Sequence, residues 1–97
     1  MSRPQAVATV LVEDEAVRVT RFDFVPGAET GWHRHSMDYV IIAVTECQML
    51  LEEPGGGTRK VVVAAGEAYK RPAGVEHNVV NHAEAPMRFI EIELKAR

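Results

Sequence analysis

The sequence predicts an all-β domain, and three observations lead to this fold class. No window of a dozen residues carries apolar side chains at helical spacing behind an N-terminal cap. Short runs rich in valine, isoleucine and phenylalanine instead alternate with polar residues at a period of two, the pattern of strands. Glycine and proline separate these runs, and roughly eight short strands with such punctuation form a sandwich or a barrel.

The first two strands are expected over residues 6–12 and 17–24. In the second run the apolar phase slips between Val19 and Phe22, which indicates a bulge or a change of face there. Residues 39–44 are almost continuously apolar, as expected for a strand that is buried on both faces.

The next strands are expected on either side of a glycine-rich segment. Residues 49–51 and 61–63 flank residues 54–58, which predicts a hairpin loop. The glycines do not resemble a phosphate-binding loop, because no helix follows them and no Lys-Ser/Thr pair closes them. The final run, residues 87–94, alternates most clearly: Met87, Phe89, Glu91 and Glu93 face one way, and Arg88, Ile90, Ile92 and Leu94 face the other.

Length and charge limit the class of protein. The chain has 97 residues, so we expect one domain over residues 1–97. Lysine and arginine number 11 and aspartate and glutamate 14, giving a net charge of −3 and no basic surface for nucleic acid or an anionic membrane. So short a chain buries only about 60–65% of its unfolded surface, which favours a bound metal or an oligomer. We expect a homodimer that covers the strands at 6–12 and 88–94.

The single cysteine and the apolar runs indicate a cellular location. Cys47 cannot form an intrachain disulfide, and we expect it to be a buried apolar residue. The N-terminal residues lack the apolar run of a signal peptide. The longest apolar stretch, residues 39–44, is far below the about 20 residues that span a bilayer. We therefore expect a cytoplasmic protein.

Three of the four histidines occupy positions that suggest a metal site. His33 and His35 are separated by one residue, and on a strand such residues point to the same side. Their imidazoles can therefore converge on one ion. His77 follows a turn signal at Pro72 and Gly74, which would place it near the start of a strand. A histidine pair of this kind is a weak signal by itself, since surface strands also carry such pairs.

Taken together, these residues resemble the two motifs of the cupin superfamily. The first half of motif one matches Gly27, His33 and His35, and motif two matches Gly66, Pro72, Gly74, His77 and Asn81. The resemblance implies a small jelly-roll β-barrel, the double-stranded β-helix, with a metal site at His33, His35 and His77. The segment Gly31–Val40 and residues 71–77 are similar to those of a subgroup of very small cupins, some of which are associated with β-alanine degradation.

The sequence departs from the cupin pattern at the acidic ligand. Motif one normally continues, three or four residues after the second histidine, with a glutamate, but Tyr39 and Val40 stand at those positions. Asp38 is adjacent, yet its side chain should point away if Tyr39 points inward. The implied ligand set is therefore three histidines without a carboxylate.

Three neutral imidazoles leave the +2 charge of an ion uncompensated, which favours a small anionic ligand or substrate. The metal would be Fe, Ni, Mn or Zn, since imidazole suits several of these ions. Similar three-histidine cupins imply an oxygenase that acts on a small anionic metabolite. The alternative is a non-catalytic binding or regulatory module, because loss of the glutamate could mark lost catalysis. An isomerase is a weaker third candidate, since the acid and base groups are few.

Four residues near the histidines are candidates for the pocket. Tyr39, a phenol of reference pKa about 10, would act as a hydrogen-bond donor or proton relay rather than as an anionic ligand. Trp32 and Met37 flank the ligands and are expected to form the pocket wall, unless they are ordinary core residues. Arg71 precedes Pro72 and could orient an anionic substrate, or it could be a solvated arginine at a strand end. His82 has the wrong parity relative to His77 and is expected to be exposed.

Overall fold

The computed structural model describes residues 2–95. Within that range the chain forms nine strands and one short 3-10 turn. The elements are β1 (Val7–Glu13), β2 (Val17–Phe24), β3 (His33–Arg34), β4 (Asp38–Ala43), β5 (Cys47–Glu52), η1 (Pro54–Gly56), β6 (Thr58–Val63), β7 (Ala68–Arg71), β8 (Glu76–Asn81) and β9 (Met87–Leu94). The predicted all-β class is therefore confirmed. No helix within residues 2–95 has the length and apolar character needed to cross a membrane.

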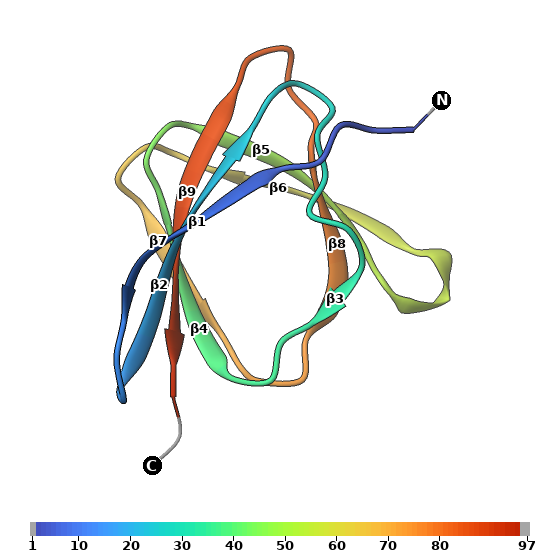
Figure 1. The fold of residues 1–97 in the computed structure, drawn as a ribbon. Coiled ribbons are helices and arrows are strands. Elements are labelled where there is room, and N and C mark those ends of the chain that lie inside the picture. The colour runs from blue at the N-terminus through green and yellow to red at the C-terminus, as the bar shows by residue number, and fades with distance from the viewer. Residues whose placement is uncertain (1, 96–97) are drawn as a thin grey trace.

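The strands form two antiparallel sheets that make up the two layers of a jelly roll (Figure 1). The larger sheet has the order β1-β2-β9-β4-β7, and the smaller has the order β3-β8-β5-β6. The strand pairs of residues 2–95 do not join the two sheets, so the closed barrel that we expected is not formed. The layers instead meet through side chains, as in a sandwich.

The core lies between the sheets, where alternate residues of each strand point inward. Phe24 and Phe89 are buried and lie with ring centroids 5.3 Å apart, and Phe22 packs against Phe89 at the same distance. Ile41 from β4 and Met49 from β5 complete the contact between the layers. Phe22, Ile41, Met49 and Phe89 also form part of the lining of a cavity between the sheets.

Two expectations about individual strands need correction, and a third is decided between its alternatives. The pairing of β2 with β9 is continuous, so the phase slip between Val19 and Phe22 is a change of face and not a bulge. A register shift does occur in β1, between Val10 and Val12. β4 is buried on its inner face only, because Val40 and Ile42 on its outer face remain half-buried. β9 lies between β2 and β4, so residues 88–94 are not an edge strand available to a partner. The hydrophobic character of β9 reflects a central position in the sheet.

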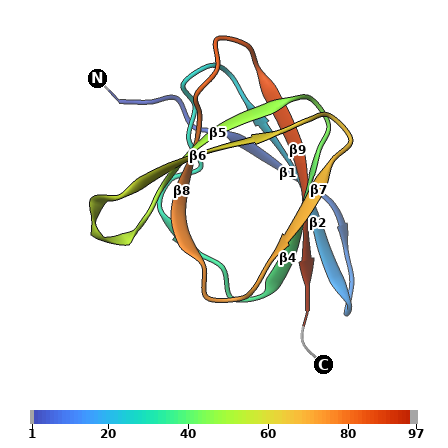
Figure 2. The same cartoon turned by 180° about the vertical axis from the view of Figure 1, so that it is seen from behind.

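The glycine-rich segment is a hairpin loop, as predicted. β5 and β6 pair from Cys47 and Val63 to Glu52 and Thr58, with the η1 turn between them. In Figure 2 this hairpin projects away from the body of the molecule.

Candidate metal centre

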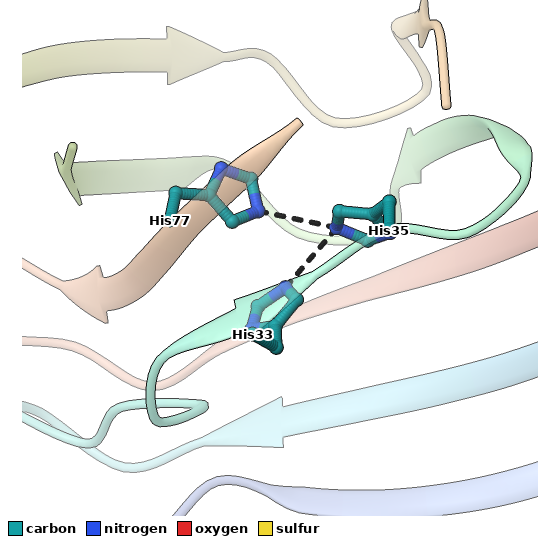
Figure 3. A group of neighbouring side chains, drawn as sticks. All are labelled: His33, His35 and His77. Atoms are coloured by element: carbon teal, nitrogen blue, oxygen red, sulfur yellow. Dashed lines mark hydrogen bonds between the residues drawn. The ribbon is translucent and has the colours of Figure 1, made fainter. Parts of the chain in front are cut away.

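The three histidines are brought together by two paired strands and the turn beside them (Figure 3). His33 on β3 is the direct cross-strand partner of His77 on β8. His35 lies two residues further on, so its side chain points to the same side as His33. The backbone holds it there, because the His35 amide donates to Val75 and its carbonyl accepts from the Gly74 amide, both at 2.8 Å. Gly74 has a φ of 98°, which glycine adopts without strain.

The ring nitrogens converge on one point. The Nε2 atom of His35 lies 3.1 Å from Nε2 of His33 and 3.2 Å from Nε2 of His77. These separations match neighbouring ligands around an ion with metal–nitrogen distances of about 2.0–2.1 Å. Facing imidazole lone pairs repel one another unless a proton or a cation lies between them. The donor set and its geometry therefore fit a divalent metal ion.

The surroundings of His33 fix which of its nitrogens can bind. Its Nδ1 lies 2.9 Å from the Gly31 carbonyl oxygen, which can only accept, so this hydrogen bond assigns the proton to Nδ1. The Thr30 hydroxyl donates to the same carbonyl at 2.9 Å. His33 therefore presents the lone pair of Nε2 to the cluster. A hydrogen bond from the remote nitrogen to a carbonyl is the usual arrangement behind a metal-bound histidine.

Burial keeps two of the histidines neutral. It lowers the pKa of both His35 and His77 to about 4, and the nearby His33 contributes in the same direction. Metal ligation needs neutral imidazole, so both side chains are ready to bind an ion at neutral pH without first losing a proton.

These pKa shifts predict that the metal-free protein loses stability in acid. In the unfolded chain both histidines take up protons near pH 6.5, but in the folded chain only near pH 4, so protons favour unfolding between these values. Glu91 acts oppositely, because its pKa is about 7 when folded and 4.5 when unfolded. We expect the free energy of unfolding to fall by about 1–2 kcal/mol from pH 7 to pH 5.

Urea denaturation in the presence of a chelator at the two pH values measures this change. Replacing Glu91 with glutamine removes the opposing contribution, so the decrease in Glu91→Gln should be roughly twice as large. Equal stability of the metal-free protein at pH 7 and pH 5 would contradict the lowered pKa values of His35 and His77.

A cavity of about 220 Å³ lies next to the histidine cluster. Its wall is apolar on the side of Phe22, Ile41 and Phe89, and polar where the three histidines and Tyr39 meet. Tyr39 is buried and its ring stacks on His35 at a centroid distance of 3.7 Å and an angle of 17°. Burial, followed by the nearby Tyr69 and Glu91, raises the pKa of the Tyr39 phenol well above its ordinary value. Tyr39 is therefore a neutral hydroxyl, able to donate a hydrogen bond or a proton.

Two carboxylates in the cavity were not among the residues expected there. Glu91 and Glu93 on β9 line it, and together with His35 they form a second group of close metal-ligand atoms. Burial, and then the negative charge of Glu93, raises the pKa of Glu91 to about 7. The alternation of β9 held the signal, since both residues share the parity of Met87 and Phe89, which are buried.

Two arginines line a second hollow that shares Tyr39, Tyr69 and His77 with the first. Arg71 lies there with its guanidinium carbon 4.7 Å from the centre of the Tyr69 ring. Arg59 on β6 lies there too, and its nearest carboxylate contact is with Glu53 at 3.6 Å. The sequence singled out Arg71 but not Arg59, because nothing local shows that Arg59 of the hairpin lines the same hollow as His77. The second hollow thus contains two arginines and the Glu53 carboxylate, whereas the cavity beside the histidines contains two carboxylates.

Trp32 and Met37 do not line either of these two hollows. Trp32 precedes His33 and so points to the opposite side of the strand, where it is 52% exposed and donates its indole proton to Glu76. Met37 is half-buried in the turn before β4. The expected wall is supplied by residues of β2, β4 and β9. Cys47 is buried, as expected, and His82 is exposed.

The fold and the site define a two-sheet jelly roll with a three-histidine cluster inside, and comparison with known proteins agrees. The cupin domain model matches residues 20–93. The chain is 52% identical over 93 residues to the beta-alanine degradation protein BauB of Pseudomonas aeruginosa, covering 96% of this chain and 97% of that one. This chain therefore belongs to the cupin family, and its resemblance to small cupins named for β-alanine degradation is confirmed.

Solved structures support the same fold. A cupin domain from Bordetella pertussis is 50% identical, with a TM-score of 0.94 and 99% of each chain covered. The polyketide cyclase RemF from Streptomyces resistomycificus is 25% identical, with a TM-score of 0.73, and the match covers 100% of this chain and 72% of that one. Identity of 50% or more over nearly the whole length is thus found with the Pseudomonas and Bordetella proteins, whereas RemF shares the fold at lower identity.

Proposed function

We propose that this cupin binds one divalent metal ion through His33, His35 and His77. The observation that carries the proposal is the convergence of the three Nε2 atoms, at 3.1 and 3.2 Å, with the remote nitrogen of His33 bonded to a carbonyl. Elemental analysis of purified protein tests it: we expect Fe, Ni, Mn or Zn at close to one ion per chain. Absence of metal after supplying each of these ions would contradict the proposal.

The finer proposal is an oxygenase that acts on a small anionic metabolite. Iron held by His33, His35 and His77 would supply redox chemistry with dioxygen at this site. The uncompensated charge at the ion would attract an anionic group, and Arg59 and Arg71 line the adjoining hollow, which shares Tyr39 and His77 with the cavity. The relative named for beta-alanine degradation is consistent with a substrate that carries a carboxylate. Oxygen consumption by the iron-loaded protein, over a panel of small thiols, diketones and amino-acid derivatives, tests this activity.

Within this proposal Tyr39 donates a hydrogen bond or a proton to the substrate. Tyr39 lines both hollows, and the raised pKa of its phenol keeps it protonated at neutral pH. The stack on His35 fixes the ring, so the hydroxyl has a defined position relative to a substrate at the histidines. Tyr39→Phe should retain metal and lose turnover, and full turnover by this variant would contradict the role.

The second candidate function is a non-catalytic module that binds a small molecule. The missing motif-one glutamate favours it, because that residue is the acidic ligand in the family pattern. A chelator separates the two functions. If a carboxylate ligand binds with the same affinity before and after metal removal, the metal is not part of the site and the module is the better description.

Arg71 provides a test of the anionic ligand that needs no knowledge of the reaction. Arg71→Gln removes a cation from the hollow beside Tyr39 and His77, so we expect the affinity for carboxylate ligands to fall by about tenfold. Lys70→Gln is the matched control, because it removes the same charge from the exposed face of the same strand. Binding of carboxylates to the metal-loaded variants can be measured by calorimetry. Equal losses in both variants would indicate only a general charge effect.

We also propose a homodimer and a cytoplasmic location. Within residues 2–95, β1 is hydrogen-bonded to β2 alone, and it exposes Val7, Val10, Leu11 and Val12. Such an edge favours pairing with a second copy. Sedimentation that shows a stable monomer at micromolar concentration would contradict the dimer.

A further inference from the structure

The cavity contains an acid although the first histidine motif lacks one. Neither Tyr39 nor Val40, which stand where the motif has its glutamate, carries a carboxylate. Glu91 reaches the same cavity from β9, more than fifty residues further along the chain. Glu91 is buried, with 8% of the residue and 11% of its side chain exposed. A carboxylate in such a place favours a nearby hydrogen-bond donor, because buried charged groups are costly when unpaired.

The carboxylate of Glu91 lies behind His35 and not beside the converging nitrogens. Glu91 Oε1 is 3.9 Å from Nδ1 of His35. The other nitrogen of the same ring, Nε2, faces His33 and His77 at 3.1 and 3.2 Å. The two nitrogens lie on different edges of the imidazole, so an ion bound by Nε2 leaves the Nδ1 proton facing Glu91.

Glu91 is available for this contact, whereas its neighbour is not. Among residues 2–95, the Glu91 carboxylate accepts no hydrogen bond, and its one ionic contact is the approach to His35. Glu93 instead pairs with Arg18 at 3.5 Å. The two acids of the cavity therefore have different surroundings. Glu91 lies next to the Nδ1 side of His35, and Glu93 forms an ion pair with Arg18 of β2.

The orientation of His35 needs such an acceptor. The stack on Tyr39 fixes the plane of the imidazole, but a half-turn about the Cβ–Cγ bond keeps that plane and replaces each nitrogen with a carbon. Val75 and Gly74 bond only the backbone of His35. An acceptor on the Nδ1 edge selects the orientation that presents Nε2 to the cluster.

We propose that Glu91 is the positioning carboxylate of the metal centre: it accepts the Nδ1 proton of His35 and holds Nε2 of His35 toward the ion. The acid missing from motif one is then supplied by the last strand, and it acts through a ligand instead of binding the metal. The proposal rests on the proposed metal site. Metal-bound histidines generally donate their second N–H to a carboxylate or a carbonyl, and loss of such a partner typically costs about 10–100-fold in metal affinity.

The test compares Glu91→Gln with wild type and with Glu84→Gln, which removes the same charge from an exposed position outside both hollows. Zinc affinity is measured by competition with a chromophoric chelator, and the His35 imidazole is followed by 1H–15N NMR of the zinc-loaded protein. We expect Glu91→Gln to weaken zinc binding by about tenfold or more and to shift the Nδ1–H resonance of His35 upfield. Glu84→Gln should retain both wild-type affinity and the wild-type resonance.

The outcomes separate this inference from the function on which it rests. If wild-type protein binds no metal, the metal site itself is wrong, and the role of Glu91 is overturned with it. If wild type binds zinc and Glu91→Gln is indistinguishable from it, only the positioning role is overturned. X-ray absorption that shows an oxygen ligand lost from the zinc shell in Glu91→Gln would make Glu91 a ligand and would also overturn the role.

Discussion

Replacing His77 with alanine is expected to weaken binding of a divalent metal by more than about a hundredfold. His77 supplies one of three converging nitrogens, and alanine offers no ligand atom in its place. The two remaining ligands, His33 and His35, come from one short segment and would hold an ion from one side only. The loss should exceed that expected for Glu91→Gln, because a ligand is removed and not merely its partner.

Competition with a chelator and elemental analysis of the dialysed variant measure this effect. His82→Ala is the matched control, since it removes an exposed histidine that lies five residues further along the chain. We expect the control to keep the stoichiometry of the wild type. Wild-type stoichiometry in both His77→Ala and His33→Ala would show that the metal binds elsewhere.

Replacing Asn81 with alanine is expected to lower the free energy of unfolding by about 3 kcal/mol, the largest effect on stability that we predict. Asn81 is 2% exposed, and its amide group donates to the carbonyls of Phe24, Val25 and Ala85, at 3.3, 3.3 and 2.9 Å. Its carbonyl accepts from the Ala83 amide at 3.0 Å. Truncation leaves these groups without a partner in a place where water is largely excluded, and it also removes packed volume.

Urea denaturation of metal-free protein at pH 7 gives the comparison. Gln48→Ala is a suitable control, because the Gln48 amide bonds an exposed carboxylate, and its loss should change stability by less than about 0.5 kcal/mol. A change of the same small size in Asn81→Ala would mean that the turn before β9 does not depend on these hydrogen bonds.

Local alternation was enough to predict the all-β class and the position of most strands. It could not predict the order of strands in a sheet, which depends on contacts between distant segments. β9 illustrates this: its sequence is compatible with an edge or a centre, and its place between β2 and β4 follows from tertiary packing. The phase slip between Val19 and Phe22 left a bulge and a change of face both possible, and the continuous pairing with β9 decides for the change of face. The register shift in β1 had no local signal.

The candidate site was predictable where its residues lie in a recognisable spacing. His33, His35 and His77 come together as their spacing indicated, with His33 opposite His77 across two strands. The inward direction of Glu91 could be predicted from its parity in β9. Its closeness to His35 could not, because that depends on how distant strands pack. Arg59 could not be found, because it enters the site through the fold of a hairpin that contains no site motif. Trp32 was assigned to the wall although its parity points it to the outside.

X-ray absorption of protein loaded with one equivalent of zinc or iron tests the central claim most directly. The account predicts one bound ion per chain, with three imidazole nitrogens at about 2.0–2.1 Å. It also predicts loss of imidazole scattering in His77→Ala. A chain that binds no ion, or an ion whose shell contains no imidazole, would contradict it.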